Sequence, residues 1–215
     1  MIIMAVLIII TAYLIGSINF AVILSGAFLK KDVRELGSGN AGATNVLRNA
    51  GLLPGILTFF CDVLKGFAAT FAGKMVFDYI IKSSMAEWSE PIYGAYFCGL
   101  ACMLGHVFPI FFQFKGGKGV AVSVGIFAVC SPISIIIGLL SFAVIVIVSK
   151  TVSLGSVIAT VIVVTLSILF NDGSGHILPK AISSVCMGLI IIIKHKENIK
   201  RIIAETETKI TSRRH

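Results

Sequence analysis

Long apolar runs alternate with short polar segments along the chain, and this pattern predicts a bundle of membrane-spanning helices. Six runs approach or exceed the roughly 20 residues that a helix needs to cross a bilayer. They cover residues 3–29, 53–73, 92–114, 133–149, 152–170 and 177–194. A shorter run, 118–131, ends at Ser131–Pro132, and proline favours the first turn of a new helix. We therefore expect an all-α, polytopic membrane protein of seven transmembrane helices in a single domain, 1–215. Six is the alternative if 118–149 is one kinked helix.

The composition agrees with lipid as the solvent of these helices. Of the 215 residues, 57% are hydrophobic and only 13% are charged, with a mean hydropathy of +1.00. A soluble domain is about half apolar and about a quarter charged. The first apolar run has no basic segment before it and continues to Leu29, so we expect a retained helix rather than a cleaved signal.

The basic residues set the expected orientation. The formal net charge is +8, which in a soluble protein would suggest nucleic acid. Here the lysines and arginines lie between apolar runs, so we expect no nucleic-acid partner. With seven helices, 14 of the 18 fall on one side of the membrane. The positive-inside rule makes that side cytoplasmic, with the N-terminus outside and the C-terminus inside. Residues 74–91 and 171–176 are the expected outer loops.

The first polar segment, residues 32–48, has the composition of an anion-binding loop. Its three glycines allow positive φ angles and leave backbone N–H groups accessible, and successive N–H groups can form a concave anion site. Its arginines can bind a phosphate through two parallel hydrogen bonds. The alternative is a solvated cytoplasmic turn. The candidate site residues in this segment are Asp32, Arg34, Ser38, Gly39, Asn40, Thr44, Asn45 and Arg48.

The second polar segment places a lysine among glycines at the start of the short helix 118–131. A helix N-terminus with accessible N–H groups beside a lysine is suited to phosphate. The candidate residues are Gly116, Gly117, Lys118 and Gly119. A Walker A loop needs Ser or Thr after the lysine, and Gly119 stands there, so a nucleoside triphosphatase is disfavoured. His106 lies in the preceding apolar run. A packing role and a direct functional role for it are equally compatible with the sequence.

The third polar segment follows the last apolar run. His195 and Asn198 are three residues apart, so in a helix they share one face. The neighbouring lysines are explained by topology, but these two side chains are not. Asp62 and Lys65 have the same spacing inside the second apolar run, where charges are costly, and we expect them to form an ion pair.

These segments resemble the three motifs of the bacterial acyl-phosphate-dependent glycerol-3-phosphate acyltransferases, the PlsY family. The first motif matches from Asp32 to Arg48 and the second from Gly105 to Ala121. Glu205 stands where the family usually has glycine, and Asn19 where it often has proline. The resemblance covers nearly the whole chain in the same order. The third motif matches at His195, Asn198, Ile199 and Arg201, and then at Glu207.

The resemblance implies acyl transfer from acyl phosphate to the sn-1 hydroxyl of glycerol 3-phosphate, which gives lysophosphatidic acid. It implies a multi-pass protein of the cell inner membrane, with its site facing the cytoplasm and no metal or other cofactor. Its partners would be both substrates, membrane lipid and a soluble acyl-phosphate synthase as supplier. The residues implied for phosphate binding are Ser38, Arg48, Gly116, Gly117 and Lys118. His195 and Asn198 match site residues of the third motif.

An acyl phosphate is already activated, so we expect catalysis to be mainly positional. Correct placement of the reactants can itself supply about 7–11 kcal/mol, and electrostatic donors add to this. We expect Lys118 to neutralise one phosphate, and His195 and Asn198 to orient the glycerol hydroxyls. Arg48 and Ser38 would hold the other phosphate, with Arg201 in support. His195 as a general base is an alternative. Which phosphate lies in which loop stays open, and a transporter of a phosphorylated anion and a non-catalytic scaffold are the rival functions.

Overall fold

The computed structural model describes residues 1–84, 90–170 and 177–210, and none of these forms a strand. The all-α prediction is therefore confirmed for the described part of the chain. Two short 3-10 helices lie at Val33–Glu35 and Ile110–Phe112. The α-helices are α1 (Ile2–Gly16), α2 (Phe20–Leu29), α3 (Ala43–Ala50), α4 (Leu52–Ser84), α5 (Pro91–Val107), α6 (Val120–Cys130), α7 (Pro132–Ser149), α8 (Val152–Leu169), α9 (Ile177–Lys194) and α10 (Lys196–Ile203).

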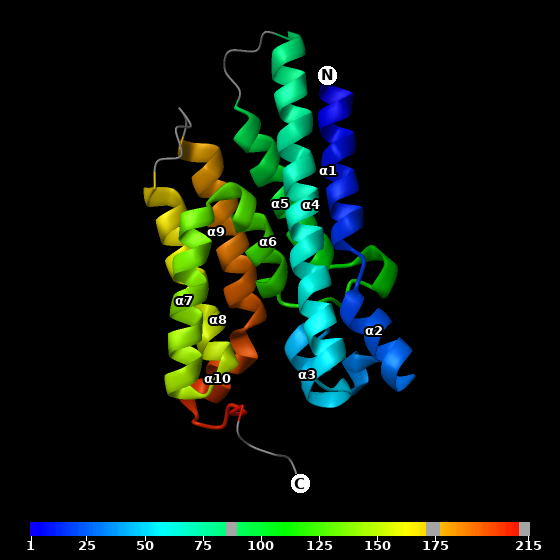
Figure 1. Ribbon diagram of the computed structural model, residues 1–215, viewed down its shortest axis with the longest axis vertical. Helices are drawn as coiled ribbons and strands as arrows, with labels where there is room; N and C mark the ends of the chain where they lie inside the picture. The colour runs from blue at the N-terminus through cyan, green and yellow to red at the C-terminus, as the bar shows by residue number, and fades with distance from the viewer. Residues whose placement is uncertain (85–89, 171–176, 211–215) are drawn as a thin grey trace.

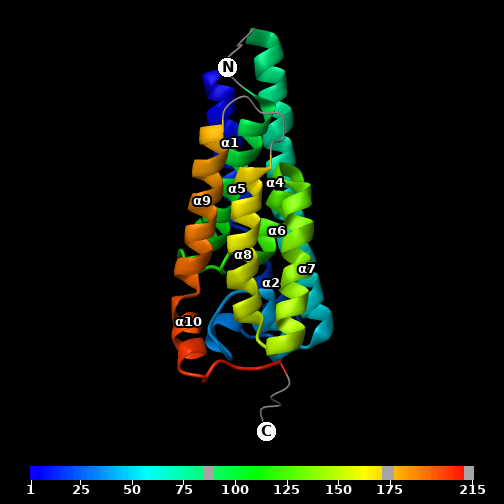
Figure 2. The same cartoon turned by 90° about the vertical axis from the view of Figure 1, so that its left-hand side faces the viewer.

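The long helices run roughly parallel to the long axis of the molecule. In Figure 1, α1 and α4 lie on one side, with α2 and α3 below them, and α7, α8 and α9 lie on the other. Helices α5 and α6 lie between these groups. In Figure 2 the molecule is turned so that α7, α8 and α9 face the viewer. The start of α1 and the short helix α10 lie at opposite ends of the long axis (Figure 1).

Six segments of the described chain are long and apolar enough to cross a membrane. They are Ile2–Leu29, Leu52–Ser83, Pro91–Phe112, Pro132–Ser149, Val152–Leu169 and Ile177–Lys194. The expected short helix 118–131 is present as α6, which has only 11 residues. Helices α6 and α7 are separate and are joined by a turn at Ser131, so 118–149 is not one kinked helix. Whether α6 counts as a seventh crossing stays a prediction.

The surface of the bundle is apolar, as expected for a protein in contact with lipid. Large side chains such as Phe60, Leu140 and Val148 are more than half exposed, whereas many serines and threonines are buried. Small residues bring the helices close together, which is how membrane helices pack without a hydrophobic driving force. A Cβ at Gly66 of α4 would collide with the backbone of α6, and one at Gly125 of α6 would collide with the backbone of α4. This close approach fixes α6, which begins directly after the glycine-rich segment Gly116–Gly119.

The sequence was wrong about two helix boundaries. The expected helix 3–29 is interrupted between Gly16 and Phe20, because the Asn19 side chain accepts a hydrogen bond from Val22 N (3.2 Å) and starts α2 as its N-cap. Helix α4 runs for 33 residues, from Leu52 to Ser84. The first part of the expected outer loop 74–91 is therefore helical. The other expected outer loop, 171–176, lies outside the described residues.

Candidate active site

Asn45 of α3 holds the first glycine-rich segment in its conformation. Its side chain is buried, and its Oδ1 atom accepts a hydrogen bond from Ser38 N (3.1 Å). Gly37 and Gly39 have φ angles of +56° and +70°, which favour glycine. The Asn45 Nδ2 atom donates over 2.9 to 3.1 Å to the carbonyl oxygens of Val33, Leu36 and Asn40. Asn45 thus shapes the loop from inside, and a phosphate contact would have to come from its neighbours.

The second glycine-rich segment packs against the end of α5. Gly117 N donates to the carbonyl oxygen of His106 over 3.1 Å. A Cβ at Gly116 would collide with that carbonyl, and one at Gly117 would collide with the His106 ring and lie 2.7 Å from Ala41 O. Glycine is therefore required at both positions by close approach. Because Ala41 belongs to the first segment, the two glycine-rich segments touch at Gly117.

A polar pocket of about 510 Å³ opens between these two segments. On one side lies Arg34, whose guanidinium donates to the Asp32 carboxylate (Nη2 to Oδ2, 2.6 Å) and to the carbonyl oxygen of Phe112 (3.0 Å). The hydrogen bonds from Arg34 hold the pKa of Asp32 below its usual value. The pocket is lined by Asp32, Arg34, Glu35, Gly39, Gln113, Phe114, Lys115, Gly116 and Lys194.

Lys118 follows Gly116 of this pocket by two residues, and its side chain contacts the third polar segment. Its Nζ atom is 2.5 Å from Oδ1 of Asn198. The Asn198 Nδ2 atom donates to Ser153 Oγ over 2.9 Å and to Glu207 Oε1 over 2.7 Å. An amide can present either its oxygen or its nitrogen to a partner. Here the two acceptors on one side of Asn198 fix its oxygen toward Lys118.

Glu207 connects the members of this cluster. Its Oε1 atom accepts from Ser153 Oγ (2.6 Å), and its Oε2 atom accepts from Arg201 Nε (2.7 Å). Burial disfavours the charged carboxylate, but the hydrogen bonds from Ser153, Asn198 and Arg201 outweigh it and hold the pKa of Glu207 below its usual value. Glu207 is therefore an ionised carboxylate at neutral pH that fixes Asn198.

Three segments that are distant in the sequence meet at Lys118. The pKa of Lys118 is lowered to about 8, mainly by burial. The negative charge of Glu207 raises this pKa, whereas the positive charges of Arg201 and Arg48 lower it further. Arg48 also approaches the C-terminal segment, with Nη2 3.4 Å from Thr208 O. A buried, partly compensated cluster of cations is suited to bind an anion such as phosphate.

His195 is buried next to this cluster. Its Nδ1 atom is 2.8 Å from the carbonyl oxygen of Ile191, so Nδ1 carries the proton and Nε2 has the free lone pair. Burial lowers the pKa of His195 to about 4. The imidazole is therefore neutral throughout the physiological range, and it is a weaker base than an ordinary histidine.

The structure brings Arg48, Lys118, His195, Asn198 and Arg201 together, and their contact with a substrate stays a prediction. It places Asp32, Arg34, Gly39 and Gly116 at the polar pocket instead. Ser38, Asn40 and Thr44 lie in or directly after the first loop, and their contact with a substrate stays a prediction. The sequence missed Ser153, which sits in the first turn of α8 and contacts Asn198. Nothing in its local sequence separates it from the other serines of the apolar runs. Glu207 could have been found, since it lies within the third motif.

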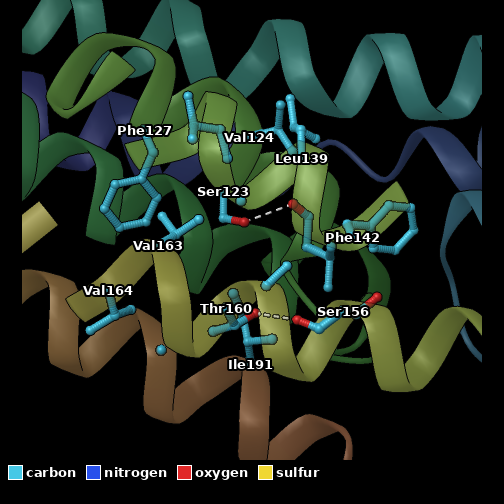
Figure 3. Close-up of a pocket in the computed structure, with 15 residues that line it drawn as sticks. Ser123, Val124, Phe127, Leu139, Phe142, Ser156, Thr160, Val163, Val164 and Ile191 are labelled. Carbon is cyan, nitrogen blue, oxygen red and sulfur yellow. Dashed lines mark hydrogen bonds between the residues drawn. The ribbon is translucent and has the colours of Figure 1, made fainter. Parts of the chain in front are cut away.

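An apolar crevice of about 40 Å³ lies between α6, α7, α8 and α9 (Figure 3). Figure 3 shows Phe142 and Ser156 toward one end and Phe127 and Val163 toward the other. The hydroxyls of Ser123 and Thr160 donate to carbonyl oxygens of their own helices over 2.7 Å, so they add little polarity to the walls.

The first end of the crevice adjoins the polar cluster. Val120 follows Lys118 by two residues, Ile191 carries the carbonyl that contacts His195, and Ser156 lies one helical turn beyond Ser153. The arrangement therefore places the polar cluster at Lys118 beside a small apolar crevice.

Comparison with known proteins places the chain in one family. Residues 6–205 match the family model described as glycerol-3-phosphate acyltransferase. The chain is 41% identical to glycerol-3-phosphate acyltransferase 2 of Bacillus anthracis, over 96% of this chain and 100% of that protein. It is 40% identical to glycerol-3-phosphate acyltransferase of Thermoanaerobacter pseudethanolicus, over 96% of each.

Two solved structures of PlsY, an integral membrane glycerol 3-phosphate acyltransferase, have the same fold. The glycerol 3-phosphate form aligns with a TM-score of 0.80 at 36% identity, over 96% of this chain and 95% of that one. The lysophosphatidic acid form aligns with a TM-score of 0.77 at 36% identity, over 95% and 94%. The extent of these matches shows that the chain is an integral membrane protein of the glycerol-3-phosphate acyltransferase family.

Proposed function

We propose that the chain transfers a fatty acyl group from acyl phosphate to the sn-1 hydroxyl of glycerol 3-phosphate. The observation that carries the proposal is the meeting of the Lys118 cluster with the apolar crevice between α6 and α9. A substrate with an anionic head and an apolar tail matches the chemistry of that junction, where a polar cluster meets apolar walls. An acyl phosphate has both parts joined at the reacting carbonyl.

Lys118 would neutralise the donor phosphate as it departs. The hydroxyl oxygen of glycerol 3-phosphate attacks the carbonyl carbon, and the bond from that carbon to the phosphate oxygen then breaks. Inorganic phosphate leaves with the bonding electron pair and takes up the hydroxyl proton. His195 is a weak base at a pKa of about 4, and the Glu207 carboxylate is engaged by three donors. The departing phosphate is therefore the better proton acceptor.

The protein would supply placement and charge. Asn198, fixed by Ser153 and Glu207, holds Lys118 at the reacting end of the donor. Electrostatic groups placed where charge develops typically contribute about 10²–10³ in rate each. The second phosphate, on glycerol 3-phosphate, would lie on the glycine-rich segments, with Arg48 or the Arg34 side of the polar pocket as its cationic partner.

We also propose seven crossings, with the N-terminus outside and the site facing the cytoplasm of the inner membrane. The start of α1 and α10 lie at opposite ends of the molecule (Figure 1), which agrees with an odd number of crossings. Helix α10, whose last turn carries Lys200 and Arg201, lies at the same end of the molecule as α2 and α3, in agreement with the positive-inside rule (Figure 1). Fusion of a reporter that is active on only one side of the membrane, to each terminus in turn, tests this topology. Equal signals from both termini would contradict it.

The reaction is tested with purified protein in lipid, radiolabelled glycerol 3-phosphate and palmitoyl phosphate. Acyl-CoA and acyl-carrier protein serve as alternative donors. We expect labelled lysophosphatidic acid with acyl phosphate alone, and a sharp loss of product in Lys118→Met. Product from acyl-CoA would reject the donor assignment. Uptake of glycerol 3-phosphate into proteoliposomes without any product would favour a transporter instead. A soluble acyl-phosphate synthase as supplier of the donor stays a prediction.

A further inference from the structure

A group of ionisable side chains on α4 and α5 lies inside the bundle and outside the cluster at Lys118. Asp62 and Lys65 belong to α4 and His106 to α5, and each is at most 5% exposed. The expected ion pair is present, with Lys65 Nζ 2.9 Å from Asp62 Oδ1, and His106 Nδ1 lies 3.6 Å from the same carboxylate oxygen. Charged groups within a membrane-spanning segment are costly and usually serve a function. A buried ion pair adds little stability over apolar side chains, so stability alone does not account for this group.

One arm of the group reaches the chain just before α2, the helix that precedes the first glycine-rich segment. Lys65 Nζ donates to the carbonyl oxygen of Ile18 over 2.7 Å. Ile18 lies at the interruption between α1 and α2. Its carbonyl oxygen therefore accepts no hydrogen bond from a backbone N–H group of a following helical turn. Helix α2 starts there and leads directly into the loop that begins at Asp32. The Lys65 contact therefore ties α4 to the residue that precedes the Asn19 N-cap of α2.

The other arm reaches the second glycine-rich segment. The Nε2 edge of the His106 ring lies against the backbone of Gly117, so closely that a Cβ there would collide with it. The His106 carbonyl also accepts the Gly117 N–H (3.1 Å). Asp62 Oδ1 lies 3.6 Å from Nδ1 of the same ring, a distance of electrostatic contact rather than of a hydrogen bond. A shift of the ring would shift the backbone of Gly117, which lies next to Lys118.

We propose that Asp62, Lys65 and His106 form a positioning network that holds the second glycine-rich segment in its phosphate-accepting conformation. The inference rests on the proposed function, since it assigns that segment to a substrate phosphate. None of the three residues belongs to the cluster at Lys118, and their effect passes through the backbone of Gly117. The network should therefore control the affinity for one phosphate rather than the rate of the chemical step.

The test is the kinetics of His106→Gln with both substrates varied in turn. We expect the KM of the substrate whose phosphate lies on Gly116–Gly119 to rise about tenfold, with the other KM and kcat within about threefold of the unmodified protein. Inhibition by inorganic phosphate competing for the same segment should weaken in parallel. The control is Thr70→Val on the same helix α4, a buried hydroxyl with no contact to Gly117, which should leave both KM values unchanged. Loss of kcat with both KM values unchanged, equal rises in both, or no change at all would overturn the proposal.

A second variant covers failure of His106→Gln to fold. Asp62→Asn combined with Lys65→Met removes both charges together, so no unpaired charge is left buried. It should give the same selective rise in one KM, with a melting temperature within about 5 °C of the unmodified protein. Normal kinetics in this double variant would contradict the network. If the unmodified protein transfers no acyl group from any donor, the proposed function fails. Direct calorimetric titration with glycerol 3-phosphate and with inorganic phosphate then tests the network alone. Equal affinities in the unmodified protein and in the double variant would reject it.

Discussion

The Lys118 ammonium group lies 2.5 Å from the Asn198 amide oxygen, although the two residues are 80 positions apart in the chain. The contact joins the start of α6 to α10, and Glu207 and Ser153 fix the orientation of the amide from the other side. Lys118 uses one of its three donors in this contact. The remaining donors are available to an anion, which makes Lys118 the residue on which the proposed reaction depends most.

We expect Lys118→Met to lower kcat about 10²–10³-fold, because it removes one electrostatic donor to the departing phosphate while keeping most of the side-chain volume. The measurement is steady-state turnover of palmitoyl phosphate in lipid. Lys196→Met is the matched control, since Lys196 is exposed and lies next to His195 in sequence. A similar loss in both variants would point to a general effect of net charge.

The pH dependence follows from the charge on Lys118. Its pKa is about 8, so the ammonium group loses its proton as the pH rises through that value. We therefore expect kcat/KM, which reports the free enzyme, to fall above about pH 8. A bound phosphate favours the charged lysine, so the fall in kcat should appear at higher pH. In any active Lys118→Arg protein the fall should disappear, because a guanidinium stays charged. A kcat/KM that is flat to pH 10 would show that the charge on Lys118 is not required.

His195→Gln distinguishes an orienting role from a base. Glutamine can replace the hydrogen-bonding capacity at Nε2 but cannot accept the proton. Loss of a general base typically costs about 10²–10⁴ in rate, and we expect a loss of less than about tenfold. Because the pKa of His195 is about 4, the unmodified protein should also show no rise in kcat/KM between pH 6 and 7. A rise in that window, abolished in His195→Gln, would establish the base role.

The apolar crevice should limit the length of the acyl chain. From Ser156 to Val164 its wall spans nine residues of α8, or eight steps, about 12 Å at the helical rise of 1.5 Å per residue. A Cβ at Gly138 would collide with Val163 across the crevice. We expect Gly138→Val to lower the ratio of kcat/KM for palmitoyl phosphate to kcat/KM for octanoyl phosphate about tenfold. A difference of one methylene group in an apolar pocket typically changes such a ratio by at least this much.

The complementary change is Phe127→Ala, which removes a large side chain from the far end of the crevice and should favour longer chains. Phe60→Ala, on the lipid-facing side of α4 with 64% exposure, serves as the control. An unchanged chain-length profile in both crevice variants would show that the acyl chain lies elsewhere.

Periodicity and composition were sufficient to predict an all-α membrane protein, because a long apolar run has few other stable states in lipid. They failed at the break near Asn19 and at the end of α4. The first depends on one side chain that caps a helix, and the second on residues 74–84, whose mixed polarity is compatible with either helix or loop. The six long apolar runs all contain helices. For α6, which has only 11 residues, composition alone does not determine whether the helix crosses the membrane, since this depends on the helices packed around it.

The sequence alone determined which residue types were available for phosphate chemistry, because glycine spacing and lysine or arginine content are properties of local segments. Only the tertiary structure decided which of them act together. Asn45 is turned into its own loop, Arg34 is paired with Asp32, and Lys118 meets Asn198. Such contacts depend on how α6 and α10 pack against α4, α8 and α9, which is a matter of distances between segments far apart in the chain. For the same reason the contact of His106 with Gly117 could not be predicted from a histidine in an apolar run.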